Sequence, residues 1–343
     1  MPPRDTTPKG HTVDGYKAAI LEHGSLKAAA KALGVQRGSI QRMIKRHDGK
    51  PYSEAPPSRW RPGAEIVAAR KAEFARVKTS DRGKGARIVH LADDGPYCVI
   101  FLGDPHLDSP GTDLSLWEHW IAPLNYRKHV HGFGLGDWLD NWVKPLAFLY
   151  GQSETPAPEG WILLEHYLDQ IGEHLVGSVA GNHDDWSGAS DVLGALMNKH
   201  GVAHASNSIG ISLRCPNGRL ITIGARHSWA GRSMWNPVHG IRRAAMMGRR
   251  ETILVGGHTH VSAESRVKHP DAETFTWCAQ VASFKTVDDY ADRLDLDDKH
   301  ASPAVAAVID PRRPDTDPQL VTLFHDPSAA TDYLAFLRRK KAA

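Results

Sequence analysis

The segment "LVGSVAGNHDDW", residues 175–186, places a short apolar run directly before an amide, an imidazole and two carboxylates. The run has the length of a buried strand, and Gly181 permits a tight turn at its end. Four other segments follow strand-like runs in the same way: "GDPHLD" (103–108), "GDWLDN" (136–141), "ARHSW" (225–229) and "GGHTH" (256–260). Loops at the carboxyl ends of sheet strands can converge above one sheet edge, so we expect these clusters to form a single site.

Strand-like and helix-like segments alternate from about residue 87 onward. Strands are predicted near 97–102, 131–135 and 175–180, and helices near 113–122, 161–174 and 189–199. "RIVHL" and "YCVIFL" predict a hairpin or two successive strands, and "GISLRC" and "RLITIGA" flank the turn "PNG". Further strands follow in "TILVGG", "FTWCAQV", "AVAAVID" and "LVTLFH", before a helix near 329–341. The pattern predicts an α/β fold with a mixed-sheet sandwich.

The five polar clusters resemble the signature of the calcineurin-like metallophosphoesterases. That signature runs D-x-H, G-D, G-N-H-(D/E), H and G-H-x-H, and the resemblance covers about residues 95–285. It implies helices on both sides of two packed sheets, an α-β-β-α arrangement. It also implies hydrolysis of phosphate esters at a centre of two divalent metal ions. One ion would be held by Asp104, His106, Asp137 and His260, and the other by Asp137, Asn182, His227 and His258.

The resemblance also assigns roles beside the metal ligands. His183 would stay off the metals and act as general acid or electrostatic stabiliser for the leaving group, and Asp140 would orient it. Asp184 fills an acidic position for which a structural hydrogen bond is as reasonable as catalysis. Oxygen and nitrogen ligands without cysteine suit Mn²⁺, which we favour, and leave Fe and Zn²⁺ open.

A basic unit precedes this region. Residues 1–88 hold 19 lysines and arginines against 8 acidic residues, whereas the remaining residues hold 23 against 31. Residues 13–47 read as three short helices that resemble a helix-turn-helix DNA-binding unit, with a small helical bundle bearing a solvated basic face as the alternative. Tyr16, Ile20 and Leu21 would pack in the first helix. The third helix would present the DNA contacts, which we expect to be Arg37, Ser39, Gln41, Arg42, Lys45 and Arg46.

Three regions follow from these patterns. Residues 1–47 form the helix-turn-helix domain, 48–86 a linker with a helix near 64–78, and 87–343 the metallophosphoesterase domain. Residues 143–160 look like an insertion that borders the site. No run reaches the roughly 18 apolar residues of a membrane span, which favours a cytoplasmic protein of a bacterium or of a phage-infected cell.

Two enzyme functions and one binding function fit the sequence. The leading hypothesis is a nuclease of phage type acting on DNA; the alternatives are a nucleotide or small-molecule phosphoesterase and a non-catalytic DNA-binding protein. Asn141 stands where protein phosphatases of this family have a phosphate-binding arginine, which argues against a phosphoprotein substrate. Tryptophans near the clusters (Trp138, Trp142, Trp186, Trp229 and Trp235) are expected to pack under the loops rather than stack on bases. The oligomeric state, including a homodimer, stays open.

Overall fold

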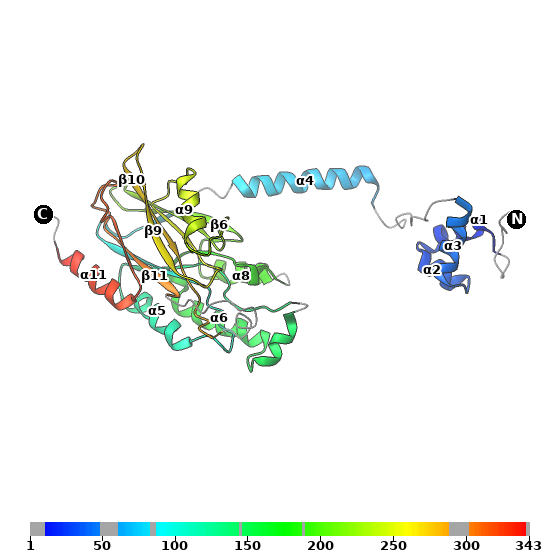
Figure 1. The fold of residues 1–343 in the computed structure, drawn as a ribbon, viewed down its shortest axis with the longest axis horizontal. Helices are drawn as coiled ribbons and strands as arrows, with labels where there is room; N and C mark the ends of the chain where they lie inside the picture. Colours follow the sequence, from blue (N-terminus) through cyan, green and yellow to red (C-terminus); the bar gives the residue numbers. More distant parts are fainter. Residues whose placement is uncertain are drawn as a thin grey trace. The chain divides into compact units, whose positions relative to one another are not determined.

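The protein divides into two compact units, Met1–Gly83 and Lys84–Ala343. In this computed structural model the described residues are 11–48, 61–82, 87–143, 146–186, 189–287 and 302–340 (Figure 1). The division falls within the predicted linker region of 48–86, whose residues 49–60 and 83–86 lie outside the described part.

Three short helices in the first unit pack around one small core. They are α1 Val13–His23, α2 Leu26–Ala32 and α3 Arg37–Asp48. Gly24 adopts a positive φ of 71° and ends α1, and Ser25 Oγ then caps α2 by accepting from Ala28 N at 3.1 Å. Tyr16 and Ile20 are buried as expected, but Leu21 is 72% exposed, because it lies one residue beyond the buried face of α1.

A longer helix, α4 Gly63–Arg82, begins one residue before the predicted helix and ends four residues after it. Its described side chains are mostly exposed, and Arg70 pairs with Glu73 at 2.6 Å across one turn. Within the described part of the chain, no helix is long and apolar enough to cross a membrane.

Two six-stranded mixed sheets form the second unit. One has the order β1-β6-β7-β8-β10-β9 and the other β12-β11-β2-β3-β4-β5. The first contains β1 Arg87–His90, β6 Ser208–Arg214, β7 Leu220–Arg226, β8 Ile253–Gly256, β9 Ala263–His269 and β10 Thr274–Gln280. The second contains β2 Tyr97–Leu102, β3 Val130–Gly134, β4 Leu175–Val179, β5 His204–Ala205, β11 Ala304–Ile309 and β12 Val321–Phe324.

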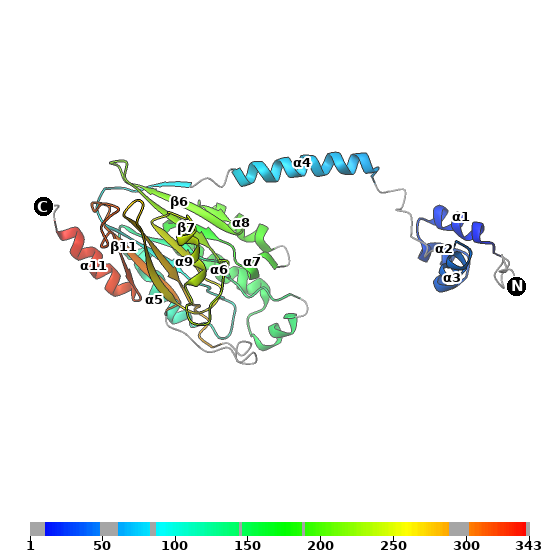
Figure 2. The same ribbon diagram turned by 45° about the horizontal axis from the view of Figure 1, so that its top comes forward.

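Helices cover the outer faces of both sheets, which gives the predicted α-β-β-α layers (Figures 1 and 2). Both faces of β2 are buried: Val99 and Phe101 face the other sheet, and Ile100 and Leu102 face the helices. This explains why "YCVIFL" is continuously apolar. The helices are α5 Leu114–Tyr126, α6 Ala157–Ile171, α8 Ala189–Lys199 and α11 Pro327–Arg339 on one side, and α9 His239–Met246 on the other.

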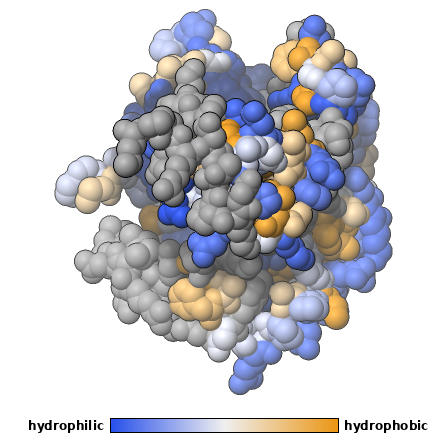
Figure 3. Space-filling model, turned by 90° about the vertical axis from the view of Figure 1, so that its right-hand side faces the viewer, coloured by the Kyte–Doolittle hydropathy of each residue, from blue (hydrophilic) through white to orange (hydrophobic). Residues whose placement is uncertain are grey.

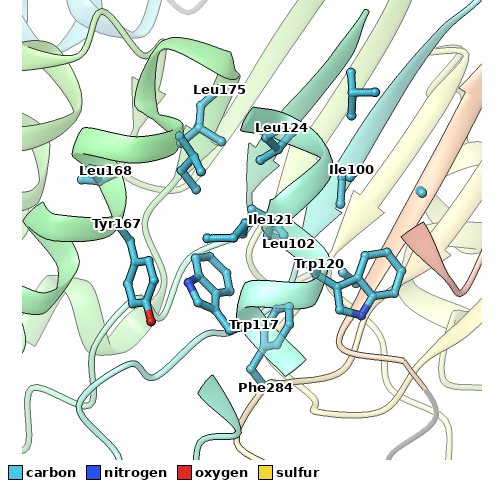
Figure 4. Close-up of a cluster of buried hydrophobic side chains, with 14 of the residues drawn as sticks. Ile100, Leu102, Trp117, Trp120, Ile121, Leu124, Tyr167, Leu168, Leu175 and Phe284 are labelled. Atoms are coloured by element: carbon cyan, nitrogen blue, oxygen red, sulfur yellow. The ribbon is translucent and has the colours of Figure 1, made fainter. Parts of the chain in front are cut away.

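Aromatic side chains fill the core between α5, α6 and the second sheet. Trp117 is fully buried and makes edge contacts with Tyr167 at 5.8 Å and Phe284 at 5.0 Å between ring centroids (Figure 4). Trp138 also contacts Trp117 edge-on at 6.1 Å. Edge-to-face packing of this kind holds α5 and α6 against the loops that carry Trp138 and Phe284.

Several local predictions can be compared with the strands directly. The hairpin around "PNG" is confirmed, because β6 and β7 pair antiparallel and Gly218 adopts a positive φ of 88°. A hairpin of β1 with β2 is wrong, since β1 pairs parallel with β6 in the other sheet; the alternative of two successive strands holds. Strand β9 and helix α9 were not predicted. The 143–160 segment contains the 3₁₀ helix η1 Leu146–Gln152 and the start of α6, with residues 144–145 outside the described part.

The surface mixes hydrophilic and hydrophobic side chains. On the face drawn in Figure 3 the two kinds are interspersed. Among the described residues, large apolar side chains that stand almost entirely in solvent include Met234 and Trp235. A single exposed apolar residue needs no explanation, but adjacent ones are informative when they border a pocket.

Candidate metal centre

The five polar clusters meet at the carboxyl ends of five strands. Asp104 follows β2, Asp137 follows β3, Asn182 follows β4, His227 follows β7 and His258 follows β8. The strands β2, β3 and β4 run parallel in one sheet, and β7 and β8 run parallel in the other. The two sheets therefore deliver their loop residues to one common edge.

One group of ligand atoms is formed by Asp104, His106 and His260, whose ligand atoms lie within 4.8 Å of one another. His260 Nε2 lies 3.4 Å from Asp104 Oδ2, and His106 Nε2 lies 4.0 Å from Asp137 Oδ2. These are the four residues predicted for the first ion. Asp104 and His106 are buried, and His260 is partly exposed.

A second group is formed by Asp137, His227 and His258. His227 Nε2 lies 3.1 Å from both Asp137 Oδ2 and Asn182 Oδ1. His227 Nδ1 lies 2.7 Å from the Leu135 carbonyl, and because a carbonyl can only accept, Nδ1 carries the proton and leaves Nε2 as the ligand atom. The structure thus brings all seven predicted ligands together: Asp137 belongs to the second group, and its Oδ2 also lies 4.0 Å from His106 Nε2 of the first group.

The residues fit divalent cations. Asp104 Oδ1 and His106 Nε2 are buried and have no hydrogen-bond partner among the described residues. Leaving a buried polar atom unpaired costs about 1–3 kcal/mol, so such atoms point to a missing partner. Carboxylate, amide and imidazole ligands suit Mn²⁺, Fe or Zn²⁺.

Backbone strain is concentrated at this centre. Among the described residues, seven non-glycine residues have a positive φ, and five of them belong to the polar clusters: His106 (44°), Asp137 (50°), Asn141 (41°), His258 (75°) and His260 (51°). This conformation is unfavourable for side chains with a Cβ and persists only where the surroundings impose it. The fold therefore holds several of the predicted ligands in positions that the local sequence disfavours.

Two glycines allow the loops to approach the ligands closely. A Cβ on Gly181 would lie 2.0 Å from Asp137 Oδ1, and one on Gly257 would lie 2.3 Å from Asp104 Oδ1. Because no Cβ stands there, the carboxylates lie close to the main chain and accept from it: His183 N donates to Asp137 Oδ1 at 2.8 Å, and His258 N donates to Asp104 Oδ2 at 2.7 Å. These bonds orient the two carboxylates.

Asp184 ties two of the loops together. Its Oδ2 accepts from Asp137 N at 2.7 Å and from Gly181 N at 2.8 Å, and its Oδ1 accepts from Trp138 N at 3.0 Å. Burial and the neighbouring Asp137 carboxylate raise the pKa of Asp184 above its usual range. Its contacts match the structural alternative among the two roles predicted for it.

The position of Asp140 differs from the prediction. Its carboxylate Oδ1 lies 2.8 Å from His106 Nδ1, and only its main-chain carbonyl reaches His183 Nδ1. The turn at Asn141, with its positive φ, directs the carboxylate and the carbonyl of Asp140 to different histidines. Asp108 is buried beside this turn, and its Oδ1 accepts from Asp140 N at 2.6 Å.

His183 lies at a third corner of the centre, where its ligand atom is within 4.8 Å of those of His106 and Asp137. Its ring packs against Trp186 and Trp142, at 4.0 Å and 5.1 Å between centroids. Burial, reinforced by His106, lowers the pKa of His183 to about 4. The side chain is therefore neutral near pH 7.

The pKa values of the two histidines that contact carboxylates, His106 and His227, shift in the opposite direction, upward. Burial lowers the pKa of His106, but the Asp140 and Asp137 carboxylates outweigh it and raise this pKa to about 9. For His227, burial is likewise outweighed by Asp104 and Asp137, and its pKa rises to about 10. Burial opposes ionisation of Asp137, yet His227, His183 and His106 hold its pKa well below the usual range.

Two cationic side chains at the centre were missed by the sequence analysis. Lys285 is buried, with Nζ 3.8 Å from Asp140 Oδ1 and 5.2 Å from the centre of the Trp142 ring. Arg232 is exposed, and its Nη2 lies 3.0 Å from His258 Nε2. A lysine ending the apolar run "VASFK" was a signal for the first; nothing in the local sequence marked the second.

The tryptophans divide between packing and the border of the centre. Trp138 is fully buried, as expected for packing under a loop, and Trp142, Trp186 and Trp229 are partly buried. Trp235 departs from the expectation, because it is 92% exposed.

The residues predicted to contact DNA lie on α3 of the first unit. Arg37, Gln41, Arg42 and Lys45 are exposed, whereas Ser39 is half-buried. The Arg46 side chain lies outside the described residues. The exposed cations share α3 with Ile40 and Ile44, which are buried in the helical core.

No family model and no curated protein matches the chain. Similar solved structures include a conserved uncharacterized protein from Streptococcus pneumoniae TIGR4, described as a predicted phosphoesterase, at 12% identity and a TM-score of 0.30, covering 67% of this chain and 97% of that chain. Vps29 from Chaetomium thermophilum is 14% identical with a TM-score of 0.33, covering 66% of this chain and 92% of its own. Vacuolar Protein Sorting 29 from Cryptosporidium parvum is 14% identical with a TM-score of 0.32, covering 67% and 97%.

Proposed function

We propose that the protein is a metal-dependent phosphoesterase, and that its substrate is a phosphodiester of DNA. The observation that supports hydrolysis is the convergence of two groups of oxygen and nitrogen ligands, with Asp137 of one group 4.0 Å from His106 of the other. Two divalent cations at such a centre would activate a water molecule and neutralise charge on the phosphate. Buried ligand atoms that have no hydrogen-bond partner in the described part of the chain support a centre that is built to hold ions.

His183 is proposed to protonate the leaving oxygen. Its Nδ1 contacts the Asp140 carbonyl and therefore carries the proton in the neutral ring, which places the lone pair on Nε2. An anionic phosphate beside Nε2 favours protonation there, since negative charge stabilises the imidazolium. His183 can then donate this proton to the departing oxygen.

Variant His183→Ala tests this role. It should slow the hydrolysis of esters with poor leaving groups more than that of activated esters, because a good leaving group departs without a proton. Equal losses for both kinds of ester would contradict the proposed acid.

The DNA substrate is supported by the basic first unit. Residues 1–83 hold 17 lysines and arginines against 8 acidic residues, and exposed Arg37, Arg42 and Lys45 lie along α3. Cations on one helix can contact the phosphates of a duplex, and such contacts weaken as the salt concentration rises. Removing residues 1–62 should weaken DNA binding and flatten its salt dependence while sparing hydrolysis of a small diester.

Two alternative functions share part of this proposal. A nucleotide or small-molecule phosphoesterase would hydrolyse its substrate at the same metal centre and would use the first unit for regulation. A non-catalytic DNA-binding protein would bind DNA through the first unit and would bind metal without turnover.

A panel of substrates separates these functions. Linear and circular DNA, single- and double-stranded, should be compared with an activated phosphodiester and a phosphomonoester, with Mn²⁺ and with EDTA. Asp137→Ala is the blank, because it removes a carboxylate that belongs to one ligand group and lies 4.0 Å from His106 of the other. Metal-dependent cutting of DNA supports the nuclease, turnover of small esters alone supports the first alternative, and no turnover with stoichiometric metal supports the second.

A further inference from the structure

A pocket of about 630 Å³ opens beside the His258 corner of the metal centre. Its lining includes Gly257 and Thr259, the two neighbours of His258, together with Arg232. The aromatic residues that contact His183, Trp142 and Trp186, lie outside this lining. The pocket therefore lies on the His258 side of the centre, and His183 lies on another side.

The walls of this pocket are suited to a flat apolar group. Trp229 is held in place, because its Nε1 donates to the Val255 carbonyl at 2.9 Å and Arg226 and Arg249 lie 5.8 Å and 5.5 Å from its ring centre. Met234 and Trp235, by contrast, are 87% and 92% exposed. Adjacent apolar side chains that stand in solvent at the rim of a pocket indicate a surface that a bound ligand would cover. The pocket volume of about 630 Å³ lies within the roughly 300–1,000 Å³ of small-molecule sites.

Arg232 stands between this pocket and the centre. Its Nη2 lies 3.0 Å from His258 Nε2, and an arginine can only donate, so this contact uses the lone pair of the imidazole. A neutral imidazole has one ring lone pair. If His258 binds a cation, the nitrogen that binds it donates this lone pair to the cation, and the other ring nitrogen carries a proton.

Metal binding therefore removes the acceptor that Arg232 has on His258. The guanidinium is then left beside a cationic centre, where an anion is its natural partner. Phosphate oxygens match the paired N–H groups of arginine and can accept two of them at once.

We propose that Arg232 binds the phosphate of the substrate and that the adjoining pocket holds a nucleoside attached through the non-leaving ester oxygen. This inference rests on the proposed phosphoesterase activity. The leaving oxygen is placed toward His183, which leaves the His258 side for the group that remains on phosphorus. Trp235 and Met234 would cover the base, and the hydroxyls of Ser228, Ser233 and Thr259 in the lining offer partners for its polar edge.

Binding measurements test the proposal without relying on turnover. Calorimetry of the full-length Mn²⁺-loaded protein would compare inorganic phosphate with thymidine 5′-monophosphate. Arg232→Gln should weaken both ligands by about tenfold or more, whereas Trp235→Ala should weaken the nucleotide about 5- to 100-fold more than it weakens phosphate. Tyr126→Ala, which removes an 82% exposed aromatic residue from the end of α5, is the matched control and should change neither affinity.

The metal itself provides a second readout. Arg232→Gln should bind Mn²⁺ at least as tightly as the unmodified protein, because it no longer competes for the His258 lone pair. Weaker Mn²⁺ binding would overturn the proposed role of Arg232, since it would show a structural contribution to the centre. Unchanged phosphate affinity in Arg232→Gln would overturn it as well.

Substrates with a common leaving group test the placement of the nucleoside. The p-nitrophenyl ester of thymidine 5′-monophosphate and methyl p-nitrophenyl phosphate release the same p-nitrophenolate. The ratio of their kcat/KM values should favour the thymidine ester and should fall about 5- to 100-fold in Trp235→Ala. A ratio that is unchanged in this variant would refute the pocket assignment even if hydrolysis is confirmed. Selective nucleotide binding without hydrolysis of any ester would instead refute the proposed function and leave the pocket assigned.

Discussion

Replacing Asp184 by asparagine should loosen the link between the loops that follow β3 and β4. The carboxylate of Asp184 accepts three main-chain hydrogen bonds, from Asp137, Trp138 and Gly181. Asparagine has the same shape but only one acceptor oxygen. Its amide nitrogen must face at least one of these N–H donors, which loses a bond and leaves a buried donor unpaired.

The expected loss in the free energy of unfolding has two contributions, the lost hydrogen bond and the unpaired donor. A hydrogen bond to a charged acceptor is worth about 1.5–3 kcal/mol, and an unsatisfied buried donor costs about 1–3 kcal/mol. Burial and the Asp137 carboxylate disfavour the charged form of Asp184, which offsets part of this loss. We expect Asp184→Asn to lower the free energy of unfolding by about 3 kcal/mol, which corresponds to roughly 6–12 °C in Tm for a unit of this size.

Thermal unfolding in the presence of EDTA measures this effect without metal binding. Asp185→Asn is the matched control, because it makes the same change at the next residue, whose side chain is exposed. Titration with Mn²⁺ should show weaker binding in Asp184→Asn than in Asp185→Asn, since Asp137 is held through its main chain by Asp184. Equal Tm values for the two variants would refute the assigned role of these hydrogen bonds.

Three further predictions follow from the two units. At pH 7.5 Mn²⁺ binding should release about two protons, because the pKa values of His106 and His227 are raised to about 9 and about 10 and both side chains must be neutral to bind the ion. The release should fall as the pH passes these two values and vanish above about pH 11. Calorimetry in buffers of different ionisation enthalpy measures it, and a heat that does not depend on the buffer would contradict it. Trp117→Ala should lower the free energy of unfolding by about 3–5 kcal/mol, because it empties a fully buried site. In the same denaturant titration Trp235→Ala should change this free energy by no more than about 0.5 kcal/mol. Similar losses in both variants would refute the packing described for Trp117. Ser25→Ala should remove the cap of α2 and reduce hydrogen-exchange protection in that helix about fivefold, and unchanged protection would show that the cap adds nothing.

The sequence by itself determined the fold class and the place of the candidate site. The alternation of strands and helices predicted a mixed-sheet sandwich, and the polar clusters after apolar runs such as Tyr97–Leu102 predicted one site at a sheet edge. The α-β-β-α layers and the set of seven ligands were implied by the resemblance of these clusters to the signature of the calcineurin-like metallophosphoesterases. These are local features, and local features can be read from one chain.

Only the tertiary structure decided which side chains meet across the loops. The pairing of β1 with β6, the contact of the Asp140 carboxylate with His106, and the approach of Arg232 to His258 join residues that are far apart in the chain. The positive φ angles at His106, Asp137 and His258 oppose local preference and exist because packing of the two sheets imposes them. Such contacts depend on the sum of many long-range interactions, which no short stretch of sequence contains.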